Sequence, residues 1–217
     1  MSVDDWLRDT EVEPPCGPNL EYDDAFMALM AAGVGKPEQQ FGDTIIPAEE
    51  PDWKGVLEQS TRLLERTKDL RVTLLLTRAL THEQGLAGFV EGLALARRLL
   101  DEHWDDAHPR LVLDGEADPI MRSNALAGLA DDAGVLKDLR AATLIATPVG
   151  GISVRNAEAV LKREPGGDGM TEGQLAQAAT AAIAANQPSL LAIPTALEHA
   201  RAVQALAEER MGVADAP

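Results

Sequence analysis

The chain of 217 residues has a single cysteine, few aromatic residues and no long apolar run. Cys16 has no second cysteine to form an internal disulfide with, which is typical of proteins from a reducing compartment. No run approaches the roughly 20 apolar residues that span a membrane. Residues 1–6 lack the basic and apolar regions of a secretory signal. We therefore expect a cytoplasmic protein.

Basic residues are also scarce, with 19 Lys+Arg against 36 Asp+Glu, for a net charge of −17. This charge argues against nucleic acid or an anionic membrane surface as a partner, because either would repel the protein. The excess is uneven, since residues 1–50 hold 12 acidic and 2 basic side chains. Any charge-guided contact is therefore expected to involve this first quarter of the chain.

The fold class predicted from the sequence is all-α. The apolar fraction of 45% and the charged fraction of 25% are those of a globular protein. Apolar residues recur at helical spacing from residue 51 onward. Residues 34–50 form a long non-helical stretch, and residues 144–154 are compatible with one short β-hairpin. We expect an antiparallel helical bundle with a long ordered N-terminal loop and a smaller C-terminal helical pair.

Helix boundaries follow from capping residues and glycines. Asp23 or Asp24 begins a short helix that Gly33 ends, Asp69 is an N-cap, and Gly85 ends the helix that Asp69 begins. Pro194 is expected to kink the last helix or to mark where its regular part begins. From residue 51 onward, helices are expected at 51–66, 70–84, 86–103, 119–130, 134–142, 154–162, 171–185 and 189–210.

The chain divides into five predicted segments. They are an extended acidic arm (1–19), a helical domain (20–145), a connecting segment (146–169), a helical pair (170–211) and the start of a linker (212–217).

Motifs for catalysis are absent or incomplete. Residues 33–37 lack the first glycine and the Ser/Thr of a phosphate loop, and no glycine fingerprint or nucleophile elbow occurs. His103, Asp105, Asp106 and His108 gather four possible metal ligands, but two His five apart on a helix point about 140° apart. We expect no enzyme and no cofactor. A metal-dependent hydrolase built on these four residues is the alternative.

One set of segments resembles a known family. Residues 41–53 keep two prolines, an aromatic at each end and an acidic centre within a loop. With five further segments, they cover about residues 14–145 in order and resemble the N-terminal ImpA-type domain of TssA proteins, which belong to bacterial type VI secretion systems. The further segments are residues 15–23, 64–71, 85–89, 104 with 108–109, and 121–126.

The resemblance implies an assembly protein and not a catalyst. Members of this family engage baseplate, membrane-complex, tube or sheath proteins, and their C-terminal regions form rings. The sequence is then expected to be the N-terminal part of a longer protein, itself a monomer or small homo-oligomer, with rings requiring the further region. Self-association through the apolar stripe of the last helix is a second alternative, although packing on the preceding helix would use that stripe equally well.

The loop of residues 41–53 supplies the candidate contact residues. Phe41 and Trp53 either anchor a partner, as interface aromatics do, or pin the loop to the protein's own helices. Lys68, Arg71 and Arg122 are expected to form ion pairs with Asp43, Glu49 or Asp52. The full candidate set is Phe41, Gly42, Asp43, Pro47, Glu49, Pro51, Asp52 and Trp53.

Overall fold

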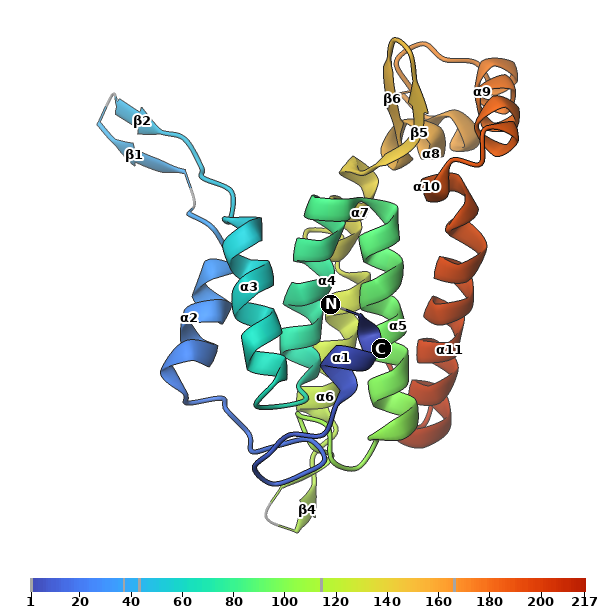
Figure 1. Cartoon of the computed structure of the whole chain (residues 1–217). Coiled ribbons are helices and arrows are strands. Elements are labelled where there is room, and N and C mark those ends of the chain that lie inside the picture. Colours follow the sequence, from blue (N-terminus) through green and yellow to red (C-terminus); the bar gives the residue numbers. More distant parts are fainter. Residues whose placement is uncertain (1, 37, 43, 114, 166) are drawn as a thin grey trace.

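A computed structural model describes residues 2–36, 38–42, 44–113, 115–165 and 167–217. Helices dominate it, which confirms the predicted fold class (Figure 1). The helices are α1 (Val3–Leu7), α2 (Asp24–Ala32), α3 (Trp53–Leu64), α4 (Leu70–Gln84), α5 (Leu86–Glu102), α6 (Ile120–Ala127), η1 (Gly128–Ala130), α7 (Val135–Ala141), α8 (Val154–Lys162), α9 (Glu172–Ala184), α10 (Pro188–Leu191) and α11 (Ile193–Met211). The strands pair as antiparallel hairpins: β1 (Gln39–Phe41) with β2 (Thr44–Ile46), β3 (Val112–Leu113) with β4 (Glu116–Ala117), and β5 (Thr143–Thr147) with β6 (Gly150–Ser153).

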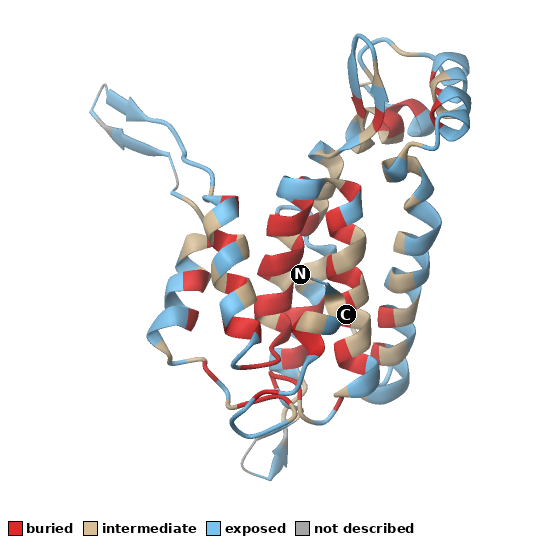
Figure 2. Cartoon of the chain, viewed as in Figure 1, coloured by how far each residue is buried: buried red, intermediate tan, exposed pale blue. Residues whose placement is uncertain are grey.

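Helices α3, α4 and α5 form the centre of the bundle and pack as antiparallel neighbours. Asp69 caps α4 by accepting a hydrogen bond from the Arg71 amide. Gly85 separates α4 from α5 with φ of +64°, a backbone angle that glycine adopts without steric cost. Figure 2 shows the buried residues concentrated on α4 and α5. Residues 70–84 are apolar on nearly all sides and many of them are buried, so α4 is a central helix.

The N-terminal segment differs from the expected extended arm. It begins with α1, which packs against α5 and α3. Trp6 and Leu7 of this helix are buried in the main core. Cys16 is also buried. The sequence did not predict this helix, because it has only five residues, is surrounded by polar sequence and is too short to show a helical period.

The C-terminal helices α9 and α11 form as predicted, but each packs on different neighbours. Helix α9 contacts β5, α8 and α10, and this group encloses a small core with Ile145, Ile152 and Leu175. Helix α11 runs back along α5 (Figure 1). Pro194 lies in the first turn of α11, so it marks the start of the regular helix.

The two segments predicted as non-helical both contain strands. Hairpin β5–β6 confirms the short hairpin expected within 144–154. Hairpin β1–β2 lies within the stretch predicted as a long ordered loop, and it projects away from the bundle (Figure 1).

Candidate functional site

An additional pair of residues, outside the two strands, closes the base of hairpin β1–β2. Lys36 and Glu49 form an isolated antiparallel bridge, with each amide 2.9 Å from the other residue's carbonyl oxygen. Their side chains pair as well, with 2.7 Å between Lys36 Nζ and Glu49 Oε2. Between this residue pair and the tip of the hairpin, Gln39 pairs with Ile46 and Gln40 with Ile45. The expected loop is thus a ribbon with a defined register.

The hairpin exposes apolar side chains to solvent. Ile45 is 59% exposed and Ile46 is 44% exposed, and Figure 2 shows the projecting ribbon as exposed along its described length. Successive side chains of a strand point to opposite faces, so each face of the ribbon presents one isoleucine. Such side chains on a projecting ribbon are available to another molecule.

The other candidate residues divide between the ribbon and the bundle. Gly42, Pro47, Glu49 and Asp52 are exposed, and Pro51 is half-buried. Asp52 caps α3 by accepting a hydrogen bond from the Gly55 amide. Asp43 and the side chain of Phe41 lie outside the described residues, so their expected roles stay predictions.

Trp53 is only 8% exposed and belongs to the main core. Its ring stacks on His82, with centroids 4.2 Å apart, and the Arg78 guanidinium carbon lies 4.7 Å from the ring centroid. Arg78 and His82 both reach Asp138 of α7, at 2.6 Å and 3.0 Å. Of the two roles considered for Trp53, this environment supports pinning the base of the hairpin to α4.

The ion pairs expected between the loop and Lys68, Arg71 and Arg122 are not formed with Glu49 or Asp52. Lys68 Nζ donates to the Leu64 carbonyl oxygen. Arg71 pairs with Asp69 and Glu21. Lys68 lies in the turn after α3, Arg71 in the first turn of α4 and Arg122 on α6, whereas the hairpin precedes α3. Spacing in the sequence could not show which partners these three cations find in the folded chain.

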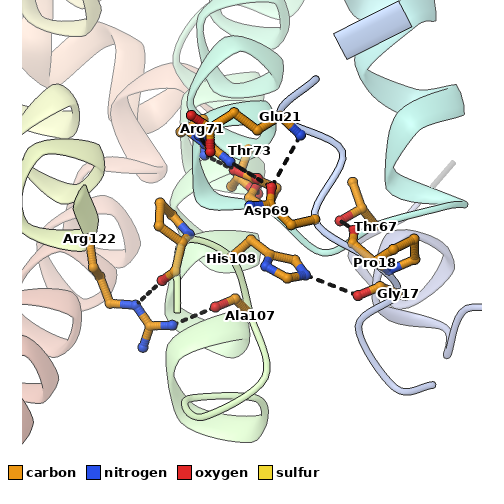
Figure 3. Close-up of polar contacts among 12 residues, drawn as sticks. Gly17, Pro18, Glu21, Thr67, Asp69, Arg71, Thr73, Ala107, His108 and Arg122 are labelled. Carbon is orange, nitrogen blue, oxygen red and sulfur yellow. Dashed lines mark hydrogen bonds and ion pairs between the residues drawn. The ribbon is translucent and has the colours of Figure 1, made fainter. Parts of the chain in front are cut away.

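Figure 3 shows the polar network around Asp69, His108 and Arg122. The Asp69–His108 bridge joins the α3–α4 turn to the loop after α5, because His108 N donates to Lys68 O and Leu70 N donates to His108 O, each at 2.8 Å. The N-terminal segment joins through His108 Nε2, which donates to the Gly17 carbonyl oxygen at 2.9 Å. Three segments far apart in sequence are therefore tied together.

Arg122 of α6 completes this network. It is fully buried and donates to the carbonyl oxygens of Trp104, Ala107 and Pro109, with 2.7 Å from Nε to Pro109 O. Burial lowers the pKa of its guanidinium to about 10, so the group is still charged near neutral pH. Because the planar, charged guanidinium donates to three carbonyl oxygens at once, it fixes the conformation of the loop after α5.

Burial also changes the acid–base behaviour of two neighbours. It raises the pKa of the Cys16 thiol to about 11 and lowers the pKa of the Lys68 ammonium. Both groups are buried beside the backbone bond from Lys68 N to Cys16 O. A thiol with a raised pKa is a poor nucleophile at neutral pH, so this site has the character of a packed interior.

The residues of the hydrolase alternative do not converge. Among the residues that the structure describes, no group of three or more His, Cys, Asp or Glu is arranged to hold a metal ion. His108 is buried and hydrogen-bonded to Gly17, whereas Asp105 lies exposed at the surface. Within the described ranges, no helix is both long and apolar enough to cross a bilayer.

Sequence reasoning did not identify one further surface, an apolar groove of about 570 Å³ between α5, α7 and α11. Phe89, Leu139 and Leu197 are among its lining residues. The apolar stripe of α11 was the available signal. Val203 of α11 is buried whereas Ile193 and Leu197 are exposed, so α5 covers only part of the apolar stripe.

The described architecture matches known proteins. The family model described as "ImpA, N-terminal, type VI secretion system" matches residues 7–131. The type VI secretion system component TssA1 of Pseudomonas aeruginosa is 38% identical over 208 residues, covering 93% of this chain and 59% of that protein. A solved structure of the TssA N-terminal domain from Burkholderia cenocepacia, including its ImpA_N region, gives a TM-score of 0.70 at 27% identity, covering 100% of this chain and 85% of that one.

The chain therefore belongs to the ImpA N-terminal domain family of the type VI secretion system, which confirms the resemblance found in the sequence. It spans 59% of the length of the TssA1 relative. The matched range begins inside the predicted arm and ends before residue 145. The five-segment division stays a prediction.

Proposed function

We propose that this domain is a non-catalytic, cytoplasmic docking module that engages baseplate, membrane-complex, tube or sheath proteins of a type VI secretion system. Hairpin β1–β2 is the contact element. The observation that carries this proposal is the projecting ribbon with Ile45 and Ile46 exposed on its two faces. Membership of the family and the name of the TssA1 relative support the setting.

The roles of the candidate residues follow from where they lie. Gly42 and Pro47 shape the tip and the end of β2, and Glu49 closes the base through Lys36. Asp52 and Trp53 attach the ribbon to the bundle. We propose that the first group meets the partner and that the second group holds the ribbon in a fixed position, which lowers the entropy lost on docking.

The test is a pull-down of purified secretion components by the full 217-residue chain. The wild type is expected to retain at least one component, and Ile45→Asp is expected to weaken retention tenfold or more. Val149→Asp is the matched control, since Val149 is 98% exposed at the turn of hairpin β5–β6. Circular dichroism checks that each variant folds. Retention of no component by the folded wild type would refute the proposal, as would equal retention by both variants.

Self-association is the second candidate, favoured by the apolar groove beside α11. Leu197 lines this groove and is 48% exposed. A second copy covering the groove would bury apolar surface that α5 leaves accessible. Light scattering should then show a concentration-dependent mass that Leu197→Asp reduces to that of the monomer. A constant monomer mass across the accessible concentrations rejects this candidate.

A further inference from the structure

The outer edge of β2 lacks a neighbouring strand. In the described part of the chain, β1 and β2 form a sheet of their own, so each strand has one paired edge and one open edge. Backbone N–H and C=O groups along an open edge are a template for another strand. A hairpin of only two strands is also marginally stable in water, so a third strand would stabilise it.

Residue types favour pairing at β2. Its residues Thr44, Ile45 and Ile46 are all β-branched and exposed. Branched side chains have high strand propensity and form stabilising cross-strand pairs. Natural edges are commonly protected by lysine or proline, and neither occurs within these three residues. Pro47 follows directly, so pairing is limited to a short segment.

Hairpin β5–β6 shows the protected arrangement. Helices α8, α9 and α10 contact β5, and Ile145 and Ile152 are buried beneath them. The described side chains of β2 have no equivalent cover. Thus the molecule covers one of these two ribbons with its own helices and leaves the other bare.

Charge around the ribbon defines the partner further. Glu38 and Glu50 are exposed near the base and form no ion pair within the described ranges, and the charge of Lys36 is matched by Glu49. The ribbon therefore carries net negative charge. A segment with lysine or arginine beside its strand-forming residues would be attracted to it.

We propose that an extended segment of a partner protein, with β-branched or aromatic residues flanked by lysine or arginine, adds as a third strand along the outer edge of β2. This inference rests on the proposed docking function and specifies how docking occurs. Backbone pairing supplies affinity, as in other strand additions, and Ile45 and Ile46 gain cross-strand neighbours on the two faces. Because Pro47 follows β2, about three residues of the partner pair with it.

The test uses overlapping 12-residue peptides that cover the baseplate, membrane-complex, tube and sheath proteins. At least one peptide with the stated chemistry is expected to bind the full chain. Amide exchange, followed by NMR with that peptide bound, is expected to slow tenfold or more for at least one residue of 44–46. Exchange at 150–153 in the β5–β6 hairpin is the internal control and should not change.

Variants separate backbone pairing from side-chain contact and charge. Ile45→Val keeps the β-branched strand former, so it should bind within about twofold of wild type. Combined Glu38→Gln and Glu50→Gln should lower the association rate several-fold, and the loss should shrink at high salt. Binding in a helical conformation, or binding without slowed exchange at 44–46, overturns strand addition.

Failure of strand addition can be distinguished from failure of docking. Suppose that a whole component is retained and that Ile45→Asp weakens its retention. If no peptide binds and amide exchange at residues 44–46 is unchanged in that complex, docking is supported and strand addition is refuted. If no component is retained by the folded chain, both proposals fall.

Discussion

The two ends of α3 carry segments of opposite character. Before its first residue stands the β1–β2 ribbon, exposed along its described length. After its last residue comes the turn of residues 65–69, where Lys68 and Asp69 are buried within a polar network. Both segments belong to the set that carries the family resemblance. The segments that carry the resemblance thus include buried residues that stabilise the fold and residues that are exposed to solvent.

This difference shows that a signature residue need not be a contact residue. For Trp53 the sequence allowed two roles, anchoring a partner or pinning the loop, and its ring packs on His82 and Arg78. Arg122 was expected to pair with an acidic residue of the loop, yet it donates to backbone carbonyl oxygens inside the bundle. Most buried polar groups need a hydrogen-bond partner, so the fold constrains the identity of a residue such as Arg122.

The largest predicted effect is on the buried network. Arg122→Ala removes the donor for three loop carbonyls and leaves a cavity, so the free energy of unfolding should fall by about 3 kcal/mol or more. Urea denaturation measures this. Arg201→Ala, at an exposed position on α11, is the matched control and should leave the midpoint unchanged. Equal midpoints for the two variants would show that the network does not stabilise the fold.

Next comes a matched pair of substitutions in the two ribbons. Ile145→Ala in β5 empties a buried site and should cost about 2–4 kcal/mol, as large-to-small core changes do. The same substitution at the exposed Ile46 should cost far less, because little buried contact is lost. Chemical denaturation of both variants provides the comparison. Similar losses would mean that the β1–β2 ribbon is packed more closely than its exposure indicates.

A third prediction concerns the Cys16 thiol. A pKa raised from 9.0 to about 11 lowers the thiolate fraction at pH 8 about a hundredfold, so a thiol reagent should react at least that much more slowly with folded than with unfolded protein. The folded pKa lies above the unfolded one, so folding favours the protonated thiol. Its contribution to stability is therefore present below pH 9 and is lost as pH rises through about 11.

The control for this labelling places a thiol on the ribbon. A Cys16→Ser, Ile45→Cys double variant should react at nearly the unfolded rate, since position 45 is exposed. Rapid labelling of Cys16 in the folded wild type would contradict the packing of the N-terminal segment.

The smallest effect is expected at the tip of the ribbon. Ile45→Ser should change the free energy of unfolding by no more than about 0.5 kcal/mol, because exposed substitutions away from packed features rarely do more. The same variant should weaken partner retention. Calorimetry combined with the pull-down checks both; loss of stability parallel to loss of binding would reassign Ile45 to the fold.

Much of the local structure was predictable. Asp69 and Gly85 begin and end α4 where expected, and α8 and α9 start within one residue of their expected positions, because capping depends on residues within one turn. The strands of β1–β2 were missed, although Thr44-Ile45-Ile46 is a β-branched run next to a glycine turn. Three residues are too few to show an alternating period.

The sequence singled out residues 41–53 as a candidate contact segment but did not show how each of its side chains lies. The stretch around residues 41–53 does leave the bundle, and its acidic character is evident from composition. Exposure of Ile45 and burial of Trp53 depend on which helix faces each side chain. Asp138, which joins Arg78 and His82, lies more than 50 residues away from both in sequence.

By itself the sequence determined most of the helices, several of their caps, the acidic first quarter and the family. Each of these depends on residue type and short-range spacing. Only the tertiary structure decided that α11 packs on α5, that the first residues form a helix with two side chains in the core, and that Gly17 meets His108 across 91 residues. An apolar stripe fixes which face of a helix is buried but not the partner that buries it. That choice belongs to long-range packing, where shape and the satisfaction of buried polar groups select among many apolar surfaces.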